Sequence, residues 1–494
     1  TVARFKMPGG ARTRPSGVTT PSSSSSLMAR AVGPDYRRPE LVQPASFLGT
    51  PAVEQRTDDA AQTMIASSPW WTGFGDPVLI TLVDTALAQN LDIAQAVARV
   101  AQARAALGAA GAALLPSGSV SAQATSMRQS LQTPVGRIVS GNPGFERNGE
   151  LYEGNLSAAW EIDLFGGLSR SKEAARADYQ GSRAGVAAAR LAIAAQTADT
   201  YIVIRGLQAR IDVARAQVDT QSRLAKIVRL QYDKGVAAEL QLRQAEGALA
   251  QVESSVPVLE AGLDTAMNAL DILLGSQPGS HRAMLVASAA IPRAPAIADT
   301  GSPADLLRRR PDLIVAESRL VASNARIGVA TAEYFPKFSL GGLLGTATTS
   351  TGGLFAGGAA QAQGFLGLRW RLFDFGRIDA EIASAKGVHA EALAGYRLAV
   401  LRASEDVENA LSALVKREAQ EATLGRGETA LARAQSASLA AYKGGVVSLI
   451  EVLDADRRLL DTRDARAQAR TETARAAVAS FRALGGGWAA APAT

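Results

Sequence analysis

The sequence predicts an α+β membrane protein built from two copies of one unit, each containing a long α-helical hairpin and two β-strands. Three observations predict this class. Nearly the same seven residues occur twice, as WEIDLFG at 160–166 and as WRLFDFG at 370–376. Each copy follows a run in which apolar and polar residues alternate, which is typical of a strand. Each also precedes a long stretch without proline, since none occurs between Pro143 and Pro257 or from 337 to 491.

The two halves of the chain align as an internal repeat. At an offset of 210 residues they share a series of landmarks: Trp160 and Trp370, Phe165 and Phe375, Gly166 and Gly376, Tyr232 and Tyr442, Gly235 and Gly445, Val236 and Val446. Pro116 aligns with Pro336 at an offset of 220. Because the offset changes from 220 to 210 between Pro116 and Trp160, we expect a loop of variable length there. The repeat predicts two structural units, 77–275 and 303–485, joined by a linker at 276–302.

Each half is expected to contain one very long helix. Apolar residues recur at helical spacing over 166–235 and 376–442. About 65 residues at 1.5 Å each span roughly 100 Å, which is more than a compact domain needs. A turn should follow each helix, at YDKGV (232–236) and KGGVV (443–447), and the chain should return as a second helix.

The returning helices should end near Leu274, with one break at Pro257, and near Leu484. A shorter helix is expected ahead of the strands in each half, at 77–114 and at 303–334. Apolar residues recur at helical spacing in both of these regions as well. Each unit is therefore expected to run from a short helix through two strands into the long hairpin.

Two candidate strands precede each long helix, and they lie at 117–129, 154–164, 337–349 and 365–373. In the second of these, one side-chain parity holds Leu156 and Trp160, whereas the other holds Ser157 and Glu161. One apolar face and one polar face are typical of strands in a membrane barrel. The loops 130–150 and 350–363 would join each pair of strands.

Four strands per chain are too few to close a barrel, and an open strand edge cannot sit in lipid. We therefore expect several chains to combine, and three copies would supply twelve strands. The longest stretch without charged residues, 338–368, is rich in glycine and threonine and makes a poor transmembrane helix.

Composition argues against several classes of function. The 52 basic and 46 acidic residues are evenly mixed and form no dense basic patch, so no nucleic acid partner is expected. The chain has no cysteine, and its two histidines, His281 and His389, have no ligand-like neighbours, so we expect no metal and no cofactor. No nucleophile, general-base or phosphate-loop arrangement occurs, and we expect that the protein is not an enzyme.

Four further stretches complete the pattern: VGPDYRRPE at 32–40, WWTGFGDPVLITLVDTALAQNLDI at 70–93, LLRRRPDLIVAE at 306–317 and YKGGVVSLIEVLDADR at 442–457. Together with the two seven-residue copies, they cover 32–487, which is nearly the whole chain. In their order and spacing, the chain resembles the TolC-like outer-membrane efflux proteins, specifically the lipoprotein branch typified by OprM and NodT.

The resemblance implies a trimer with a twelve-stranded outer-membrane β-barrel and a periplasmic α-barrel formed by the duplicated hairpins. Such proteins are passive exit ducts of tripartite efflux pumps for drugs or other small toxic compounds. They work with a periplasmic adaptor and an inner-membrane transporter of the RND type, in the outer membrane of a Gram-negative bacterium, with a large periplasmic portion. An exit duct for type I secretion and a periplasmic coiled-coil adaptor or scaffold remain alternatives.

The N-terminal region is expected to differ from the repeats. Residues 1–31 contain SSSSS and no apolar core, and we interpret them as a disordered leader. The resemblance implies that 32–76 runs extended along the equatorial region, and 486–494 should form a C-terminal tail. Lipoprotein relatives carry an acylated cysteine just before VGPDY, where this chain has Ala29-Arg30-Ala31. A replaced cysteine, a member without acylation and a different N-terminus are the alternatives.

The resemblance implies that the two hairpin tips contact the adaptor. The tip residues are Lys234, Gly235, Val236, Lys443, Gly444, Gly445 and Val446. Glycine permits a tight turn between antiparallel helices, so Gly235 and the pair Gly444 and Gly445 also have a purely structural explanation.

A candidate gate follows the second tip, at Ile450, Glu451, Asp454 and Arg457. Ile450 and Asp454 share a helix face, and Asp454 can pair with Arg457 three residues further on. In a symmetric trimer, one inward Asp454 per chain forms a ring of three carboxylates that concentrates cations. The resemblance places aperture rings at these positions, whereas the residues alone also fit ordinary surface pairs with Arg457 and Arg458.

Trp160, Gly166, Trp370 and Gly376 mark the expected junctions between strand and long helix. Amphipathic indole rings are well suited to the level of the lipid headgroups. Simple packing at the junction explains the two tryptophans equally well.

Overall fold

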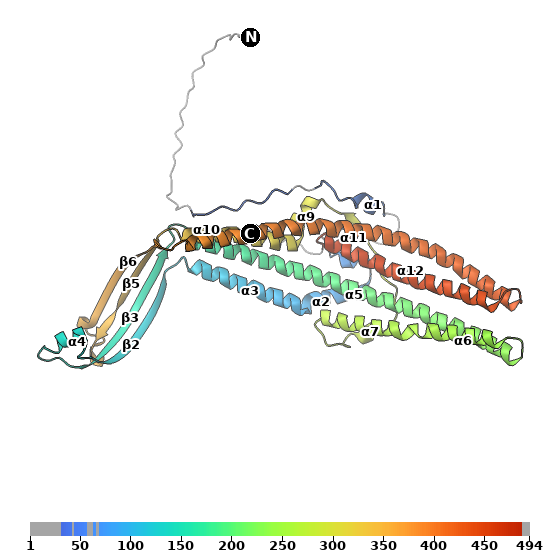
Figure 1. Cartoon of the computed structure of the whole chain (residues 1–494), viewed down its shortest axis with the longest axis horizontal. Helices are drawn as coiled ribbons and strands as arrows, with labels where there is room; N and C mark the ends of the chain where they lie inside the picture. Colours follow the sequence, from blue (N-terminus) through green and yellow to red (C-terminus); the bar gives the residue numbers. More distant parts are fainter. Residues whose placement is uncertain (1–30, 42–43, 57–62, 66–68, 487–494) are drawn as a thin grey trace, which may run out of the picture.

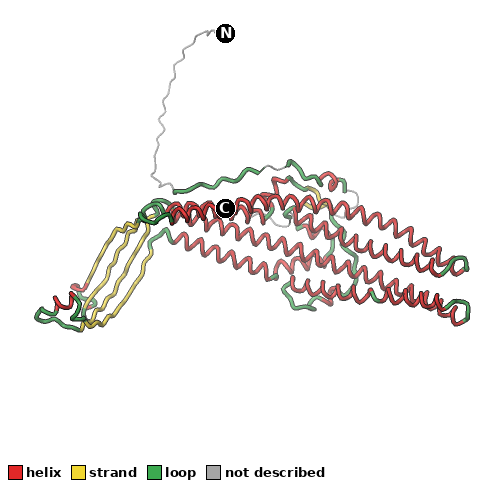
Figure 2. The backbone as a smooth tube through the Cα atoms, in the orientation of Figure 1, coloured by secondary structure: helices red, strands yellow, loops and turns green. Residues whose placement is uncertain are grey.

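The structure, a computed structural model, describes these parts of the 494-residue chain: 31–41, 44–56, 63–65 and 69–486. The expected leader before Ala31 and the C-terminal tail after Gly486 lie outside the described residues. The molecule is elongated, with a layer of long helices at one end and a four-stranded sheet at the other (Figure 1; Figure 2). Among the described helices, none has an apolar stretch of the length that a lipid bilayer requires.

Two helices of equal length dominate the fold. α5 (Gly167–Asp233) and α11 (Arg377–Lys443) have 67 residues each, and at 1.5 Å per residue each extends about 100 Å. At the tips the chain reverses into α6 (Glu239–Glu253), α7 (Ser255–Leu273) and α12 (Leu449–Ala483). The predicted long helices and the predicted turns are confirmed.

The helices form one wall. α5 packs against α6 and α7 on one side and against α12 on the other, and α12 also packs against α11 (Figure 1). Closer to the sheet, α3 (Leu91–Ala112) and α10 (Pro311–Ala332) take the places of α7 and α12. The two hairpins therefore meet where α5 contacts α12.

The prediction of single helices over 77–114 and 303–334 is wrong. Each region contains two helices separated by one extended residue: α2 (Pro77–Gln89) and α3, then α9 (Pro303–Arg309) and α10. Asn90 ends the first because its side-chain oxygen caps α3, accepting from the N–H of Asp92 at 2.9 Å. Arg310 ends the second because a residue before proline is pushed out of the helical conformation.

The helix that returns from the first tip is interrupted at Ser254, and not at the predicted Pro257. α6 ends at Glu253 and α7 begins at Ser255. Pro257 lies in the first turn of α7, where its missing N–H leaves no helical hydrogen bond unmade. The proline is therefore accommodated within a helix and does not end one.

The four long strands form one antiparallel sheet in the order β2-β3-β5-β6. They are β2 (Ser117–Arg128), β3 (Asn148–Ile162), β5 (Lys337–Thr348) and β6 (Ala360–Arg369). β3 and β6 begin earlier than predicted, because backbone pairing with their neighbours continues into residues without the alternating pattern. β6 ends at Arg369, so Trp370 and Leu372 lie beyond the strand, contrary to the prediction.

Short elements complete the fold. Two short strands pair in parallel, and the remaining short helices lie in the connections: β1 (Thr63–Ile65), β4 (Ala296–Asp299), α1 (Thr50–Glu54), η1 (Trp70–Phe74), α4 (Pro134–Val139), α8 (Arg282–Leu285), η2 (Thr351–Gly353) and η3 (Gly357–Ala359). α4 lies in the loop between β2 and β3, at the end of the sheet farthest from the helices (Figure 1).

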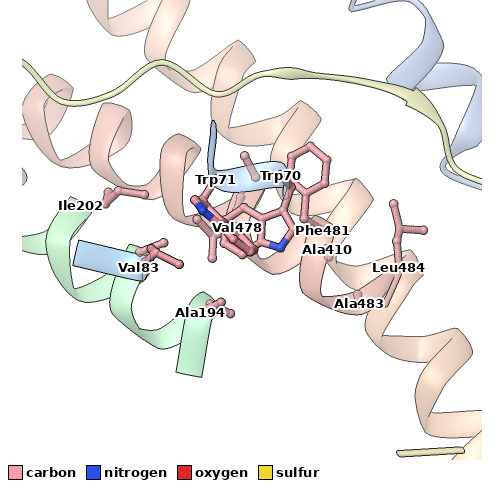
Figure 3. Close-up of a cluster of buried hydrophobic side chains, with 14 of the residues drawn as sticks. Trp70, Trp71, Val83, Ala194, Ile202, Ala410, Val478, Phe481, Ala483 and Leu484 are labelled. Carbon is pink, nitrogen blue, oxygen red and sulfur yellow. The ribbon is translucent and has the colours of Figure 1, made fainter. Parts of the chain in front are cut away.

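The main apolar core surrounds Trp70 (Figure 3). The Trp70 indole is fully buried and stacks on Phe481 of α12 with ring centroids 5.7 Å apart, and Trp71 meets it edge-on at 5.6 Å. Val83 of α2 and Ala410 of α11 belong to the same cluster. The cluster therefore ties α2, α11 and α12 together.

The described residues between 31 and 56, here called the N-terminal strap, run along the helical wall (Figure 1). Arg170 of α5 bonds to Asp35 at 2.7 Å and donates to the carbonyl oxygen of Val32 at 3.1 Å. Glu408 of α11 accepts a hydrogen bond from the backbone N–H of Leu48 at 2.6 Å. The strap thus connects the long helices of the two repeats.

Candidate functional site

The strand register gives the sheet one apolar face. Leu156 of β3 lies opposite Val120 of β2 and Leu344 of β5, and Leu340 of β5 lies opposite Leu366 of β6. These side chains are exposed, and Val120 reaches 81% exposure. A continuous apolar surface of this kind indicates contact with another molecule or with lipid.

The opposite face of the sheet is mainly polar, although Leu343 and Phe365 also lie on it. The hydroxyl oxygens of Ser119 and Ser157 lie 2.9 Å apart across β2 and β3, and the amide nitrogen of Gln361 donates to the side-chain oxygen of Asn155 at 2.7 Å. Polar side chains thus bond to one another across the strands on this face. The alternation predicted for 154–164 is confirmed within β3, where Leu156 and Ser157 lie on opposite faces.

The two tryptophans at the junctions make the same bond. Nε1 of Trp160 donates to the carbonyl oxygen of Leu114, and Nε1 of Trp370 donates to that of Tyr334, both at 2.9 Å. Each indole therefore ties the end of a strand to the end of the short helix in its own repeat. These hydrogen bonds support the explanation that the two tryptophans pack at the junctions. Their position at the level of the lipid headgroups stays a prediction.

The start of each long helix is also the same in both repeats. Gly166 and Gly376, with φ of 78° and 86°, immediately precede α5 and α11. Asp163 caps α5 by accepting from the N–H of Ser169 at 2.7 Å, and Asp374 caps α11 by accepting from that of Ile378 at 2.7 Å. Neither aspartate was predicted as a cap, although aspartate ahead of an apolar helical pattern is a recognised start signal.

The two tips share one turn geometry. The backbone N–H of Gly235 donates to Tyr232 and that of Gly445 to Tyr442, at 2.8 and 2.9 Å, and both glycines have φ of 74°. This left-handed conformation favours glycine. Gly444 has φ of −81°, which any residue can adopt, so the expectation that both glycines of the pair serve the turn is wrong for Gly444.

The remaining tip residues are exposed. Lys234 immediately follows α5 and Lys443 is the last residue of α11. Val236 and Val446 are 76% and 79% exposed. Behind the tips the hairpins contact each other through a small apolar cluster that includes Leu224 and Val452. A contact of this surface with an adaptor stays a prediction.

Glu451 has a structural role at the start of α12 that its sequence pattern did not predict. α12 begins after Ser448, and the Glu451 carboxylate accepts from both the backbone N–H and the hydroxyl of Ser448 at 3.4 Å. The bond from the Ser448 N–H is the glutamate half of a capping box, and it satisfies this backbone donor at the start of the helix. In this conformation Glu451 therefore stabilises the start of its own helix, α12.

The other candidate gate residues lie on one exposed face of α12. Ile450 and Asp454 are one turn apart, and both are exposed. Asp454 pairs with Arg458, at 2.8 Å, whereas Arg457 lies 3.9 Å from Asp461. The predicted pair of Asp454 with Arg457 is therefore replaced by a pair with Arg458, four residues after Asp454 on the same helix.

Long helical hairpins joined to a sheet with one apolar and one polar face are the features of an outer-membrane channel subunit. The family model described as outer membrane efflux protein matches residues 82–276 and 303–486, which correspond to the two repeats. The chain belongs to this outer membrane efflux protein family. The resemblance to TolC-like proteins is thereby confirmed.

Curated relatives match almost end to end. The chain is 31% identical over 449 residues to the pyoverdine export outer membrane protein OpmQ of Pseudomonas putida, across 90% of this chain and 93% of that protein. It is 30% identical over 485 residues to nodulation protein T of Rhizobium leguminosarum bv. trifolii, across 95% and 97% of the two chains.

Solved structures of outer-membrane channels have the same fold as this chain. The outer-membrane channel OprN gives a TM-score of 0.83 at 33% identity, covering 92% of this chain and 99% of that chain. The open state of the Neisseria gonorrhoeae MtrE outer membrane channel gives 0.77 at 25% identity, covering 93% and 98%. The protein is thus a Gram-negative outer-membrane efflux protein with a large periplasmic portion.

Proposed function

We propose that three copies of this chain form one passive outer-membrane duct, with a twelve-stranded β-barrel and a periplasmic tube of helices. The observation that carries the proposal is the four-stranded sheet with one apolar and one polar face. β2 and β6 are its edges, and among the described strands each has a neighbour on one side only. Pairing β6 of one copy with β2 of the next leaves no open edge in lipid.

The two faces of the sheet fit this arrangement. The apolar face with Val120, Leu156 and Leu344 would contact lipid, and the polar face with Ser157 and Asn155 would line the water-filled interior. The helices continue from the strands, so the duct would extend into the periplasm by about 100 Å. Transport through such a duct needs no chemistry in this chain, because the energy is supplied elsewhere.

Asp454 is the proposed gate residue. Three copies related by a threefold axis would bring three Asp454 carboxylates together near the tip, where they attract cations and repel anions. Ile450, one turn closer to the tip, would form an apolar ring that closes the pore by contact and by excluding water. The exposure of both side chains on one face of α12 supports this assignment.

The tips are the proposed contact with a periplasmic adaptor, which connects the duct to an inner-membrane transporter of the RND type. Val236 and Val446 present exposed apolar side chains at the end of each hairpin, beside Lys234 and Lys443. Exposed apolar residues flanked by charges are suited to packing against another helical hairpin.

The proposed cargo class is drugs or other small toxic compounds. The names of relatives mention pyoverdine export, toluene efflux and cation efflux, at 31%, 30% and 28% identity. Because similar chains serve such different compounds, we infer that this chain admits what its transporter delivers. Cargo selection then belongs to the inner-membrane partner.

Conductance in planar bilayers tests the proposal. Properly folded wild-type trimer should conduct with a preference for cations, and Asp454→Ala should reduce that preference or increase the open probability. Asp461→Asn, which removes another exposed carboxylate of α12, is the matched control and should leave the preference largely intact. Folded trimer that never conducts would rule out the duct.

A further inference from the structure

A buried carboxyl group lies close to the candidate gate. Asp456 of α12 is only 2% exposed, although Arg457 and Arg458 beside it are exposed. It follows Asp454 by two residues, which turns an α-helix by about 200° and places the two carboxyl groups on opposite faces. Val452 and Leu459 share the buried face with Asp456. Asp456 is therefore directed into the contact between the two hairpins.

Asp456 has one weak partner on the other hairpin. Nε2 of Gln221 in α5 lies 3.5 Å from Oδ2 of Asp456, which is longer than the usual hydrogen-bond distance of about 2.9 Å. Burial raises the pKa of Asp456, and the hydrogen bond with Gln435 of α11 opposes this rise. The ionised carboxylate is thus poorly compensated where it lies.

The polar atoms around this position also lack partners. Among the described residues, these buried atoms make no hydrogen bond: Nε2 of Gln217, Oε1 of Gln221 and Oγ of Ser438. Gln217 and Gln221 are one turn apart on α5, and Ser438 follows Gln435 by three residues on α11. Oε1 of Gln221 is an acceptor that needs a donor. An ionised carboxylate offers none, whereas a protonated carboxyl offers one O–H.

The charged groups on the surrounding helices do not compensate Asp456. The described ones are exposed or already paired. The exposed ones are Asp219, Arg223 and Lys226 on α5 and Arg433 on α11. The paired ones are Arg243 with Glu246 on α6, Arg457 with Asp461 and Arg458 with Asp454 on α12, and Glu428 of α11 with Arg463 and Arg466. The Glu428 group lies about two helical turns away from Asp456 toward the sheet. Tyr442 of α11, nearer the tip, donates to Gln231 of α5 at 2.8 Å.

We propose that Asp456 and Gln221 form a proton-operated latch between the two hairpins. Asp456 is protonated while the hairpins are packed together and donates its O–H to Oε1 of Gln221, once the amide has turned. When the hairpins separate, water reaches the carboxyl group and the proton passes to that water. The latch rests on the proposed function, because it assumes that the hairpins separate when the duct opens.

The direction of the pH dependence follows from this scheme. The packed state binds one more proton per protomer than the separated state, so acid favours packing. The ratio of packed to separated hairpins should fall as the pH rises above 3.8, the ordinary carboxyl value. One proton per protomer limits this change to about tenfold per pH unit.

Spin labels at the tips measure the latch directly. The chain has no cysteine, so Lys234→Cys and Lys443→Cys together place one label on each tip. Labelled full-length chains are assembled with an excess of unlabelled chains, and the distance between the two labels is recorded from pH 5 to pH 8. In the wild type, the fraction with the longer distance should increase with pH.

Two variants separate the latch from general charge effects. Asp456→Asn keeps a hydrogen-bonding side chain without the charge, and its hairpins should stay packed at every pH. Asp461→Asn removes an exposed carboxylate from the same helix and should respond to pH like the wild type. A wild-type response in Asp456→Asn, or a lost response in Asp461→Asn, would overturn the proposal.

A third variant covers the case in which Asp456→Asn does not assemble. Gln221→Leu removes the acceptor, so the packed fraction at pH 5 should fall toward its value at pH 8; an unchanged fraction would contradict the latch. Conductance measured on the same samples separates the two proposals. A pH-dependent distance without conductance counts against the duct alone, whereas conductance with a pH-independent distance counts against the latch alone.

Discussion

Nε of Arg458 lies 2.8 Å from Oδ2 of Asp454, one helical turn earlier on the exposed face of α12. The carboxylate of the candidate gate is therefore partly neutralised within its own helix. An exposed pair of this spacing contributes only about 0.3–0.5 kcal/mol. The pair can consequently break at little cost if an assembled gate or a passing cation requires the carboxylate.

Replacing Arg458 with glutamine should increase the cation preference of the channel, because Asp454 would then keep its full charge. Reversal potentials in a salt gradient measure this preference. Arg457→Gln is the matched control, since Nε of Arg457 lies 3.9 Å from Asp461 and makes no bond with Asp454. Equal increases in both variants would show that the net charge of the tip, and not Asp454, determines selectivity.

The tip glycines should differ in their tolerance of a side chain. Gly445→Ala should destabilise the second tip by about 1–2 kcal/mol, because a left-handed conformation strains any residue with a Cβ. Gly444→Ala should have little effect, since its φ of −81° suits alanine. Limited proteolysis at the tip measures the difference. If both variants are cleaved at the same rate, the turn does not depend on the left-handed residue.

Arg170→Met should release the N-terminal strap from α5. The Arg170 side chain is 7% exposed and pairs with Asp35, which is itself 69% exposed, so losing this charged hydrogen bond should destabilise the contact by about 1.5–3 kcal/mol. Hydrogen exchange of the strap amides should accelerate accordingly. Arg215→Met, which breaks an exposed pair with Glu260, is the control and should change stability by less than about 1 kcal/mol. An unchanged exchange rate in Arg170→Met would show that other contacts hold the strap.

Gly206 marks a close approach of α5 to α12. A Cβ there would lie 2.3 Å from Oγ1 of Thr471, so Gly206→Ala should reduce the free energy of unfolding by about 1–3 kcal/mol. Adding Thr471→Ala should restore part of the loss, as denaturant unfolding would show. Gly185→Ala on the same helix meets no atom within 4 Å and should instead be neutral or slightly stabilising. Without partial rescue in the double variant, the close approach is not the cause.

Much of the fold follows from local patterns, and these were predictable. The left-handed turns at Gly235 and Gly445 depend on residues within a few positions, and the two faces of β3 follow from alternation along one strand. The breaks at Asn90 and Arg310 also had local signals, a capping residue and a following proline, but the helical spacing on both sides outweighed them in the prediction.

The candidate site was less predictable, because its contacts join distant parts of the chain. Gln221 and Asp456 are 235 residues apart, and nothing near Asp456 distinguishes it from the exposed acids around it. Its burial depends on how α12 rotates against α5. At Asp454, the local alternative of a surface pair is present, with Arg458 as the partner.

The equal length of α5 and α11 constrains how this protein can change. Deleting one residue from either helix would shorten it by about 1.5 Å and rotate everything beyond by about 100°. A deletion in α5 before Gln221 would turn Gln221 away from Asp456. A deletion in either helix would leave the two tips at different levels. Loops such as 129–147 carry no such register and can gain or lose residues freely. The two hairpins can therefore diverge in sequence, but a change in the length of one hairpin requires the same change in the other.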